Sequence, residues 1–165
     1  MISPTVSVIG KQEVEQALKD LALKLAGPTR VLAGVPKGAG TYEDGLTLAT
    51  IAAVNNFGSA DGTIPARPTL GPAIEKGAPQ YQRLAEVMIP KVLTGEMTML
   101  TLLEQMGNLA EGHIKQEITD LKTPPNAAST IAAKGSDNPL IDTGAFRQSI
   151  RYVIDDTGEE LEEGL

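Results

Sequence analysis

Near its end the chain reads Pro139-Leu140-Ile141-Asp142-Thr143-Gly144-Ala145-Phe146-Arg147-Gln148-Ser149-Ile150-Arg151-Tyr152-Val153, and this stretch decides the fold. We expect Asp142 or Thr143 to cap a short helix, because their side-chain oxygens accept hydrogen bonds from the free N–H groups of a first helical turn. Phe146 and Ile150 stand four residues apart, so they share one face of that helix. The stretch therefore predicts a helix that anchors the end of the chain.

A turn and a short strand complete this closing unit. Gly144 is predicted to begin the turn. Residues 151–154 include an aromatic and two β-branched side chains, Tyr152, Val153 and Ile154, which favour a strand. Tyr152 and Ile154 then lie on one side of that strand, since side chains alternate between its two faces. A helix followed by a strand at the end of the chain indicates a sheet whose other strands come from earlier in the sequence.

The triplet Asp142-Thr143-Gly144, which follows two apolar residues, also resembles the nucleophile turn of retroviral-type aspartic proteases. That chemistry needs two carboxylates that share a proton, which one such chain could supply only by dimerising. A half-enzyme of this kind carries its Asp near the start of a β-rich domain, whereas here the chain stops at Leu165, shortly after Gly144, and its last residues, from Asp155, are too polar for a core strand. The structural interpretation is therefore favoured over the protease, and no enzymatic activity is expected.

The composition of the 165-residue chain excludes several other classes of function. Its net charge of −7 disfavours binding to nucleic-acid phosphates, because such binding depends on lysine and arginine. It has no cysteine, and therefore no disulfide and no thiolate zinc site. No apolar run reaches the roughly 20 residues of a membrane span, and the first residues do not resemble a secretion signal. No cofactor and no contact with a membrane are expected.

Apolar spacing predicts a first half with two strands and two helices. Residues 12–26 form an amphipathic helix, with a stripe at Val14, Leu18, Leu21 and Leu25. Residues 30–36 form a strand, and a short segment at residues 6–9 is expected to be a strand or an arm. Further elements follow in this half: a glycine-rich loop at 37–45, a helix at 48–56 that begins at Thr47, and an irregular segment at 59–68.

The second half is predicted to be mainly helical. Residues 70–76 form one helical piece and Pro79 opens another that reaches about residue 93, with Pro90 expected to kink or end it. Residues 97–121 form the longest helix, and residues 126–134 a short one. The fold class is therefore α+β: a small antiparallel sheet packed with several helices, a long central helix and extended loops. We expect a single domain at 1–154 and an acidic tail at 155–165.

Three features suggest chemistry but are better explained structurally. His113 is the only histidine, and with Glu111 or Glu117 it makes an incomplete metal site. Lys37 lies in a glycine-rich segment, but it precedes glycine instead of the Ser or Thr of a phosphate-binding loop. The methionines on the long helix fit an adaptable surface or an ordinary core; they are Met97, Met99 and Met106.

Three segments together resemble one protein family. They are Ala52-Ala53-Val54-Asn55-Asn56-Phe57-Gly58, Ile64-Pro65-Ala66-Arg67-Pro68-Thr69-Leu70-Gly71-Pro72-Ala73-Ile74, and the stretch from Pro139 to Val153. In this order and spacing the chain is similar to the tail-completion or head–tail joining (neck) proteins of tailed bacteriophages. It departs from that family where Thr69 follows Arg67-Pro68, because the family usually has Phe there, and at Gly71, where the family often has Arg.

The resemblance implies a structural virion protein, made in the bacterial cytoplasm, that forms a ring at the neck, expected to be a hexamer. Its partners are then copies of itself, other neck, connector and tail proteins, and DNA that passes through the lumen without sequence-specific binding. A tail terminator that caps the tail tube is the alternative within this class. Pro65 and Pro68 stiffen the loop that carries Arg67, which we expect to pair with a carboxylate of its own or a neighbouring subunit. The candidate interface residues are Lys37, Tyr42, Phe57, Ile64, Pro65, Arg67, Pro68 and Leu70.

Overall fold

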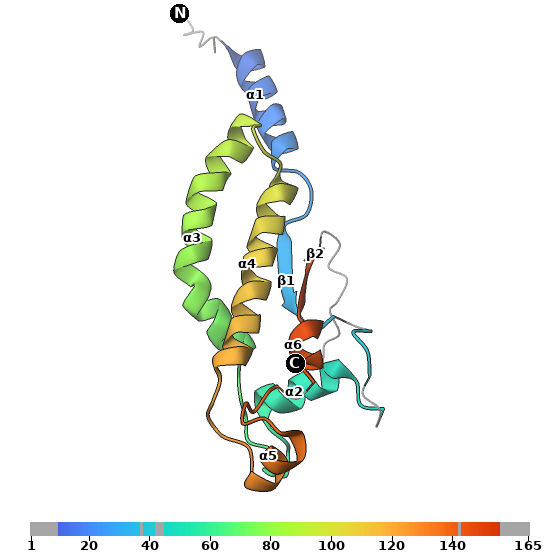
Figure 1. Ribbon diagram of the computed structural model, residues 1–165. Helices are drawn as coiled ribbons and strands as arrows, with labels where there is room; N and C mark the ends of the chain where they lie inside the picture. Colours follow the sequence, from blue (N-terminus) through green and yellow to red (C-terminus); the bar gives the residue numbers. More distant parts are fainter. Residues whose placement is uncertain (1–9, 37, 42–44, 142, 156–165) are drawn as a thin grey trace, which may run out of the picture.

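Helix α4 (Met99–Asp120) forms the centre of the fold, and the computed structural model describes residues 10–36, 38–41, 45–141 and 143–155. The Thr98 hydroxyl accepts a hydrogen bond from the Thr101 backbone N–H (3.1 Å), so a side-chain cap begins the helix. A turn at Gly95, whose φ is 82°, joins α4 to the antiparallel helix α3 (Leu70–Thr94), and Figure 1 shows the two as a long hairpin. The predicted central helix is confirmed, with its start two residues later.

A two-stranded antiparallel sheet packs against α4. Strand β1 (Arg30–Gly34) pairs with strand β2 (Arg151–Asp155), so that Ala33 lies opposite Tyr152. The sheet approaches α4 closely because Gly107 has no side chain: a Cβ atom there would lie 2.2 Å from the Tyr152 ring. This arrangement confirms the α+β class with a small antiparallel sheet and a long central helix.

Helix α3 corrects one prediction, because it continues through both prolines instead of dividing at Pro79 and ending near Pro90. The two prolines are eleven residues apart, about three helical turns, so they share one face, and both are exposed. The carbonyls that lose a partner belong to Glu75 and Glu86, which are also exposed, so water replaces the lost hydrogen bonds. Figure 1 shows α3 bowed outward from α4, as expected for a helix with prolines on its solvent side.

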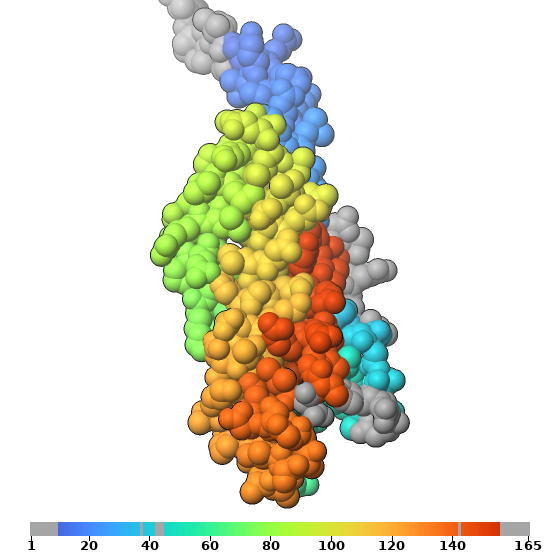
Figure 2. Space-filling view, in the orientation of Figure 1, coloured from blue at the N-terminus to red at the C-terminus, as the bar shows by residue number. Residues whose placement is uncertain are grey.

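The remaining helices lie at the two ends of the hairpin. Helix α1 (Lys11–Lys24) extends beyond the turn between α3 and α4, and buries none of its residues (Figures 1 and 2). Helices α2 (Leu48–Phe57), α5 (Ala128–Lys134) and α6 (Ala145–Ser149) lie toward the opposite end. The predicted helices in these regions are confirmed, and α2 begins where the Thr47 hydroxyl accepts a hydrogen bond from the Thr50 N–H (3.1 Å).

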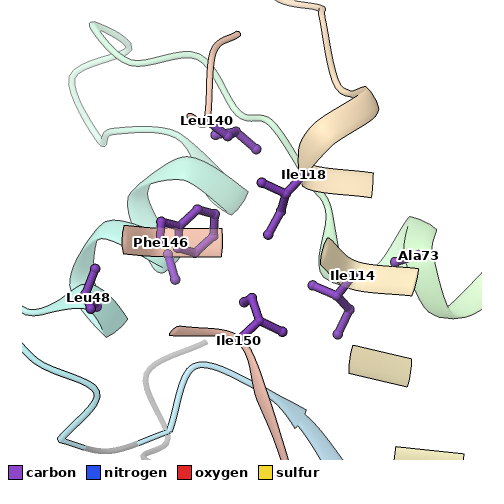
Figure 3. Packing of buried hydrophobic residues seen from close by; sticks show 8 residues of the cluster. Leu48, Ala73, Ile114, Ile118, Leu140, Phe146 and Ile150 are labelled. Atoms are coloured by element: carbon purple, nitrogen blue, oxygen red, sulfur yellow. The ribbon is translucent and has the colours of Figure 1, made fainter. Parts of the chain in front are cut away.

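The main core joins segments that are far apart in the sequence (Figure 3). Ile114 and Ile118 of α4 and Ile150 are completely buried, and the expected pairing of Phe146 with Ile150 on one buried face is confirmed. The eight buried members of this cluster are Leu48, Ala52, Ala73, Ile114, Ile118, Leu140, Phe146 and Ile150. A second cluster lies inside the hairpin at Met88, Val92 and Leu102, and the methionines Met97, Met99 and Met106 pack against it as ordinary core.

The closing unit differs from its prediction in two details. Helix α6 has Gly144 at its N-cap with a φ of 82°, and the Thr143 hydroxyl accepts a hydrogen bond from the Ala145 N–H (3.3 Å). Asp142 and the expected strand or arm at residues 6–9 lie outside the described residues. Asp155 is the buried last residue of β2 and pairs with Arg30, so the predicted boundary of the acidic tail moves by one residue, and residues 156–165 are not described.

Replacement of Gly107 by alanine should destabilise the protein by about 1–3 kcal/mol, because the added methyl group overlaps the Tyr152 ring and the sheet must move away from α4. Gly112→Ala is the matched control in the same helix, since a Cβ there meets nothing within 4 Å. It should stabilise the protein by about 0.5–1 kcal/mol through helix propensity. Urea unfolding measures the change in the free energy of unfolding for each variant. Changes of the same sign in the two variants would contradict the close packing of α4 and β2.

Candidate functional site

The last residue of α2 and the loop that follows it, which we together call the docking loop (residues 57–68), are held in shape by hydrogen bonds within the loop. The Ser59 N–H donates to the Ile64 carbonyl (2.9 Å), and the Ile64 N–H donates to the Ser59 hydroxyl oxygen (2.8 Å). The Gly62 N–H donates to the Ser59 carbonyl (3.0 Å). A loop with this many internal contacts keeps its shape when it is exposed to water.

Asp61 organises the exposed half of the docking loop. Its carboxylate accepts hydrogen bonds from the Ser59 hydroxyl (2.5 Å), the Thr63 hydroxyl (2.7 Å) and the Thr63 N–H (3.0 Å). These donors favour the ionised form, so they lower the pKa of the Asp61 carboxyl from 3.8 to about 2. Sequence reasoning missed Asp61, although Ser and Thr placed two residues to either side of an Asp are a recognisable turn signal.

Gly58 is the residue that lets the docking loop fold back on itself. Its φ is 81°, a conformation that residues with a side chain rarely adopt. A Cβ atom there would also lie 2.9 Å from the Ile64 carbonyl oxygen and 3.0 Å from the Ala66 nitrogen. The glycine after α2 is therefore required both by the backbone conformation and by the close return of the chain.

Arg67 anchors the docking loop to the body of the protein, and only 5% of it is exposed. Its Nε donates to the Pro124 carbonyl (2.9 Å), and its Nη2 donates to the Pro125 carbonyl (3.1 Å) and to Asn126 Oδ1 (3.2 Å). Burial lowers the pKa of the guanidinium from its usual value. The expected salt bridge is therefore wrong: Arg67 uses its charge to bind carbonyl oxygens of the segment after α4.

Of the predicted interface residues, four are exposed, two pack against the rest of the protein, and two lie outside the described residues. Phe57 and Ile64 are exposed (61% and 38%), and Pro65 and Pro68 are exposed beside them in the same loop. Leu70, the first residue of α3, instead packs against the main core. Arg67 is buried, as described above. The two other predicted residues, Lys37 and Tyr42, lie outside the described residues.

The residues considered for catalysis or metal binding have structural partners. His113 Nδ1 bonds with the Tyr81 hydroxyl (2.8 Å), and its Nε2 bonds with Gln80 Oε1 (2.5 Å). Glu117 binds Lys76 (2.6 Å) and Glu111 binds Lys115 (2.5 Å), so neither carboxylate is directed at the histidine. In the part of the chain that the structure describes, no three His, Cys, Asp or Glu residues come together to hold a metal ion.

Comparison of this chain with protein-family models, with curated proteins and with solved structures finds no match. None of the described helices combines the length and the apolar character needed to cross a bilayer. The docking loop is therefore characterised by its geometry alone. It is a stiff, exposed loop with two exposed apolar side chains, Phe57 and Ile64, and the buried Arg67 anchors it to the segment after α4.

Replacement of Arg67 by methionine should destabilise the protein by about 1–3 kcal/mol, because the half-buried Pro124 carbonyl and Asn126 side chain then lose the charged donor that binds them. Arg83→Met on the exposed face of α3 is the control and should change stability by less than about 0.5 kcal/mol. Thermal or urea unfolding provides the measurement. Equal effects of the two substitutions would show that Arg67 does not tie the docking loop to the segment after α4.

The hydrogen bonds to Asp61 should persist above pH 4 and weaken as the pH falls toward about 2, because only the ionised carboxylate accepts all three. A carboxyl carbon NMR titration should therefore give Asp61 a midpoint near 2. Ser59→Ala removes the largest cause of the shift and should raise that midpoint toward 3.8. A midpoint near 3.8 in the unaltered protein would mean that the docking loop does not hold this conformation in solution.

Proposed function

We propose that this chain is a structural virion protein of the head–tail junction of a tailed bacteriophage, with no catalytic role. Copies of it form a ring, expected to be a hexamer, that joins the tail to the head connector and keeps the DNA channel continuous. The docking loop makes the contact with the neighbouring neck or tail protein. Heterologous contacts around a closed ring allow every copy to use the same loop in the same way.

The observation that supports this proposal is the meeting of the three family-like segments at one place. Ala52, Ala73 and the trio Leu140, Phe146 and Ile150 come from the first, second and third segments, and all of them belong to the main core. A resemblance spread over separate parts of a sequence carries more weight when those parts pack together, since each then depends on the others. The segments therefore behave as one structural unit, which the resemblance requires.

The geometry of the docking loop fits a role in protein–protein contact. A loop fixed by its own hydrogen bonds loses little conformational freedom when it binds, so more of the contact energy appears as affinity. Phe57 and Ile64 supply exposed apolar surface that a partner can bury, and aromatic anchors of this kind carry much of the energy of interfaces. The acidic balance of the chain, −7, suits a channel wall along which DNA slides without adhering.

Electron microscopy of phage particles that carry a labelled copy of this chain tests the proposal. Density in a ring between head and tail is the expected result, and the symmetry of that ring gives the copy number. Density at the end of the tail tube alone would instead identify a tail terminator. Absence of the label from finished particles would contradict both.

The same particles test the docking loop. Phe57→Ser should leave the protein folded but prevent joining, so that filled heads and free tails accumulate separately. Val87→Ser is the matched control, because Val87 is equally exposed (60% against 61%) but lies on α3. Both substitutions should change the unfolding free energy by less than about 0.5 kcal/mol. Normal joining by the Phe57 variant would exclude the docking loop as the contact, even where the ring is found at the neck.

A further inference from the structure

Helix α1 has an apolar stripe that the other described residues of the chain leave largely exposed. Val14, Leu18 and Leu25 are exposed by 58%, 60% and 40%, and Leu21 is only half-buried. The steps between these four residues are four, three and four, which places them along one side of the helix. An isolated helix of 14 residues is marginal in water, so most of its stability has to come from packing of such a stripe.

The contacts of α1 with the rest of the chain are confined to its C-terminal end. Lys24 Nζ donates to the Leu93 carbonyl at the end of α3 (2.9 Å), and its side chain lies beside Gly95. From there α1 continues past the turn of the α3–α4 hairpin, and Figures 1 and 2 show its N-terminal half standing clear of every other element. Among the described residues, none covers the half of the stripe that contains Val14 and Leu18.

The turn region of the hairpin carries the complementary surface. Ile89 and Leu93 are one helical turn apart near the end of α3, and they are exposed by 42% and 40%. Leu100, in the first turn of α4, is exposed by 45%. We call these three residues the hairpin tip. One chain thus presents both an exposed apolar helix face and exposed apolar residues at the hairpin tip, but the helix projects away from its own tip.

We propose that α1 is an assembly arm that packs its stripe against the hairpin tip of a second copy of this chain. The inference rests on the proposed function in one respect, that the copies form a closed assembly. Each copy then gives one arm and receives one, so every arm and every tip is covered. A different protein as partner would cover only one of these two surfaces and leave the other in water.

Charge supports a second copy as the occupant. The chain as a whole carries −7, so two copies repel each other in general. Helix α1 is neutral, because its three lysines balance Glu13, Glu15 and Asp20. It is therefore an element that can approach another acidic copy without adding to the repulsion. The same balance, together with the lack of any aromatic residue in α1, disfavours an anionic lipid surface, which selects basic helices with aromatic anchors.

The size of the contact also favours a closed assembly over a single arm-to-tip contact. One face of a helix about 21 Å long removes roughly 400 Å² from water on each side, or roughly 800 Å² in all. Stable complexes bury about 1,200–2,000 Å². A single docked arm is therefore too small by itself, whereas two copies that exchange arms place two such contacts in one interface and reach that range.

The test uses the full chain and compares Leu18→Glu with Leu23→Glu by analytical ultracentrifugation over a range of concentrations. Leu18 lies in the stripe; Leu23 is even more exposed (74%) but lies about 140° around the helix from it. We expect the unaltered chain to associate, Leu18→Glu to weaken association at least tenfold, and Leu23→Glu to leave it unchanged. A chain that stays monomeric at every concentration up to about 1 mM, or equal effects of the two substitutions, would overturn the inference.

Cysteine pairing identifies the surface that the arm meets. The chain has no cysteine, so a copy with Leu18→Cys and a copy with Ile89→Cys can form only introduced disulfides. Mixing and mild oxidation should give a cross-linked pair that contains one of each copy, and Leu23→Cys in place of Leu18→Cys should not. Failure of the first mixture to cross-link would remove the hairpin tip as the receptor.

Two further outcomes separate this inference from the proposed function. Sedimentation with phosphatidylglycerol vesicles that is lost in Leu18→Glu would assign α1 to a membrane surface and overturn the inference. A dimer held together by α1, with no label at the neck of particles, would support the arm and contradict the neck ring. A neck ring that forms normally with Leu18→Glu would support the proposed function and contradict the role of α1 as the assembly arm.

Discussion

Burial of one face of α4 is the constraint on which the rest of the structure depends. Ile114 and Ile118 are completely removed from water, and Ile150 packs against them from the closing unit. Burial of three such side chains contributes about 2 kcal/mol each, a large part of the net stability of a domain this size. The same helix accepts α3 on one side and the sheet on another, where Gly107 brings Tyr152 against its backbone. The docking loop and α1 take their positions from elements that α4 holds.

The elements that the sequence predicted correctly are those whose causes are local. The predicted start at Thr47 is confirmed, because its hydroxyl accepts a hydrogen bond from the N–H group three residues later, a signal that can be read from a few neighbouring letters. Thr98 begins α4 in the same way, but the start predicted at residue 97 overlooked it. The continuity of α3 could not be read in this way. Whether Pro79 and Pro90 break a helix depends on whether the carbonyls they leave unpaired face water or core, and that is known only once α4 defines the buried side. Their spacing of eleven residues was the available clue.

The candidate site shows the same division between local and long-range causes. Phe57, Ile64 and the two loop prolines were predicted to be available for contact, and all four are exposed in the structure. Arg67 was misassigned because its partners are backbone carbonyls of residues 124 and 125, which carry no signature in the sequence. A charged side chain in a polar loop suggests a salt bridge, but peptide oxygens can also accept hydrogen bonds from the five N–H donors of a guanidinium. Asp61 was overlooked because its role is to shape the loop. Its carboxylate accepts hydrogen bonds from Ser59 and Thr63 of the same loop.

The distribution of exposed apolar residues indicates why this chain is suited to an assembly. With only 3% aromatic residues, the chain has a core made mainly of Leu, Ile, Val, Met and Ala side chains, and α1 buries none of its residues. Exposed apolar side chains include those of the docking loop and, at the other end of the molecule, those of the arm and the hairpin tip. A monomer in water gains nothing from either. Two sites at opposite ends of an elongated subunit allow one to bind copies of the same chain while the other binds a different protein, which is the division of contacts that a joining ring requires.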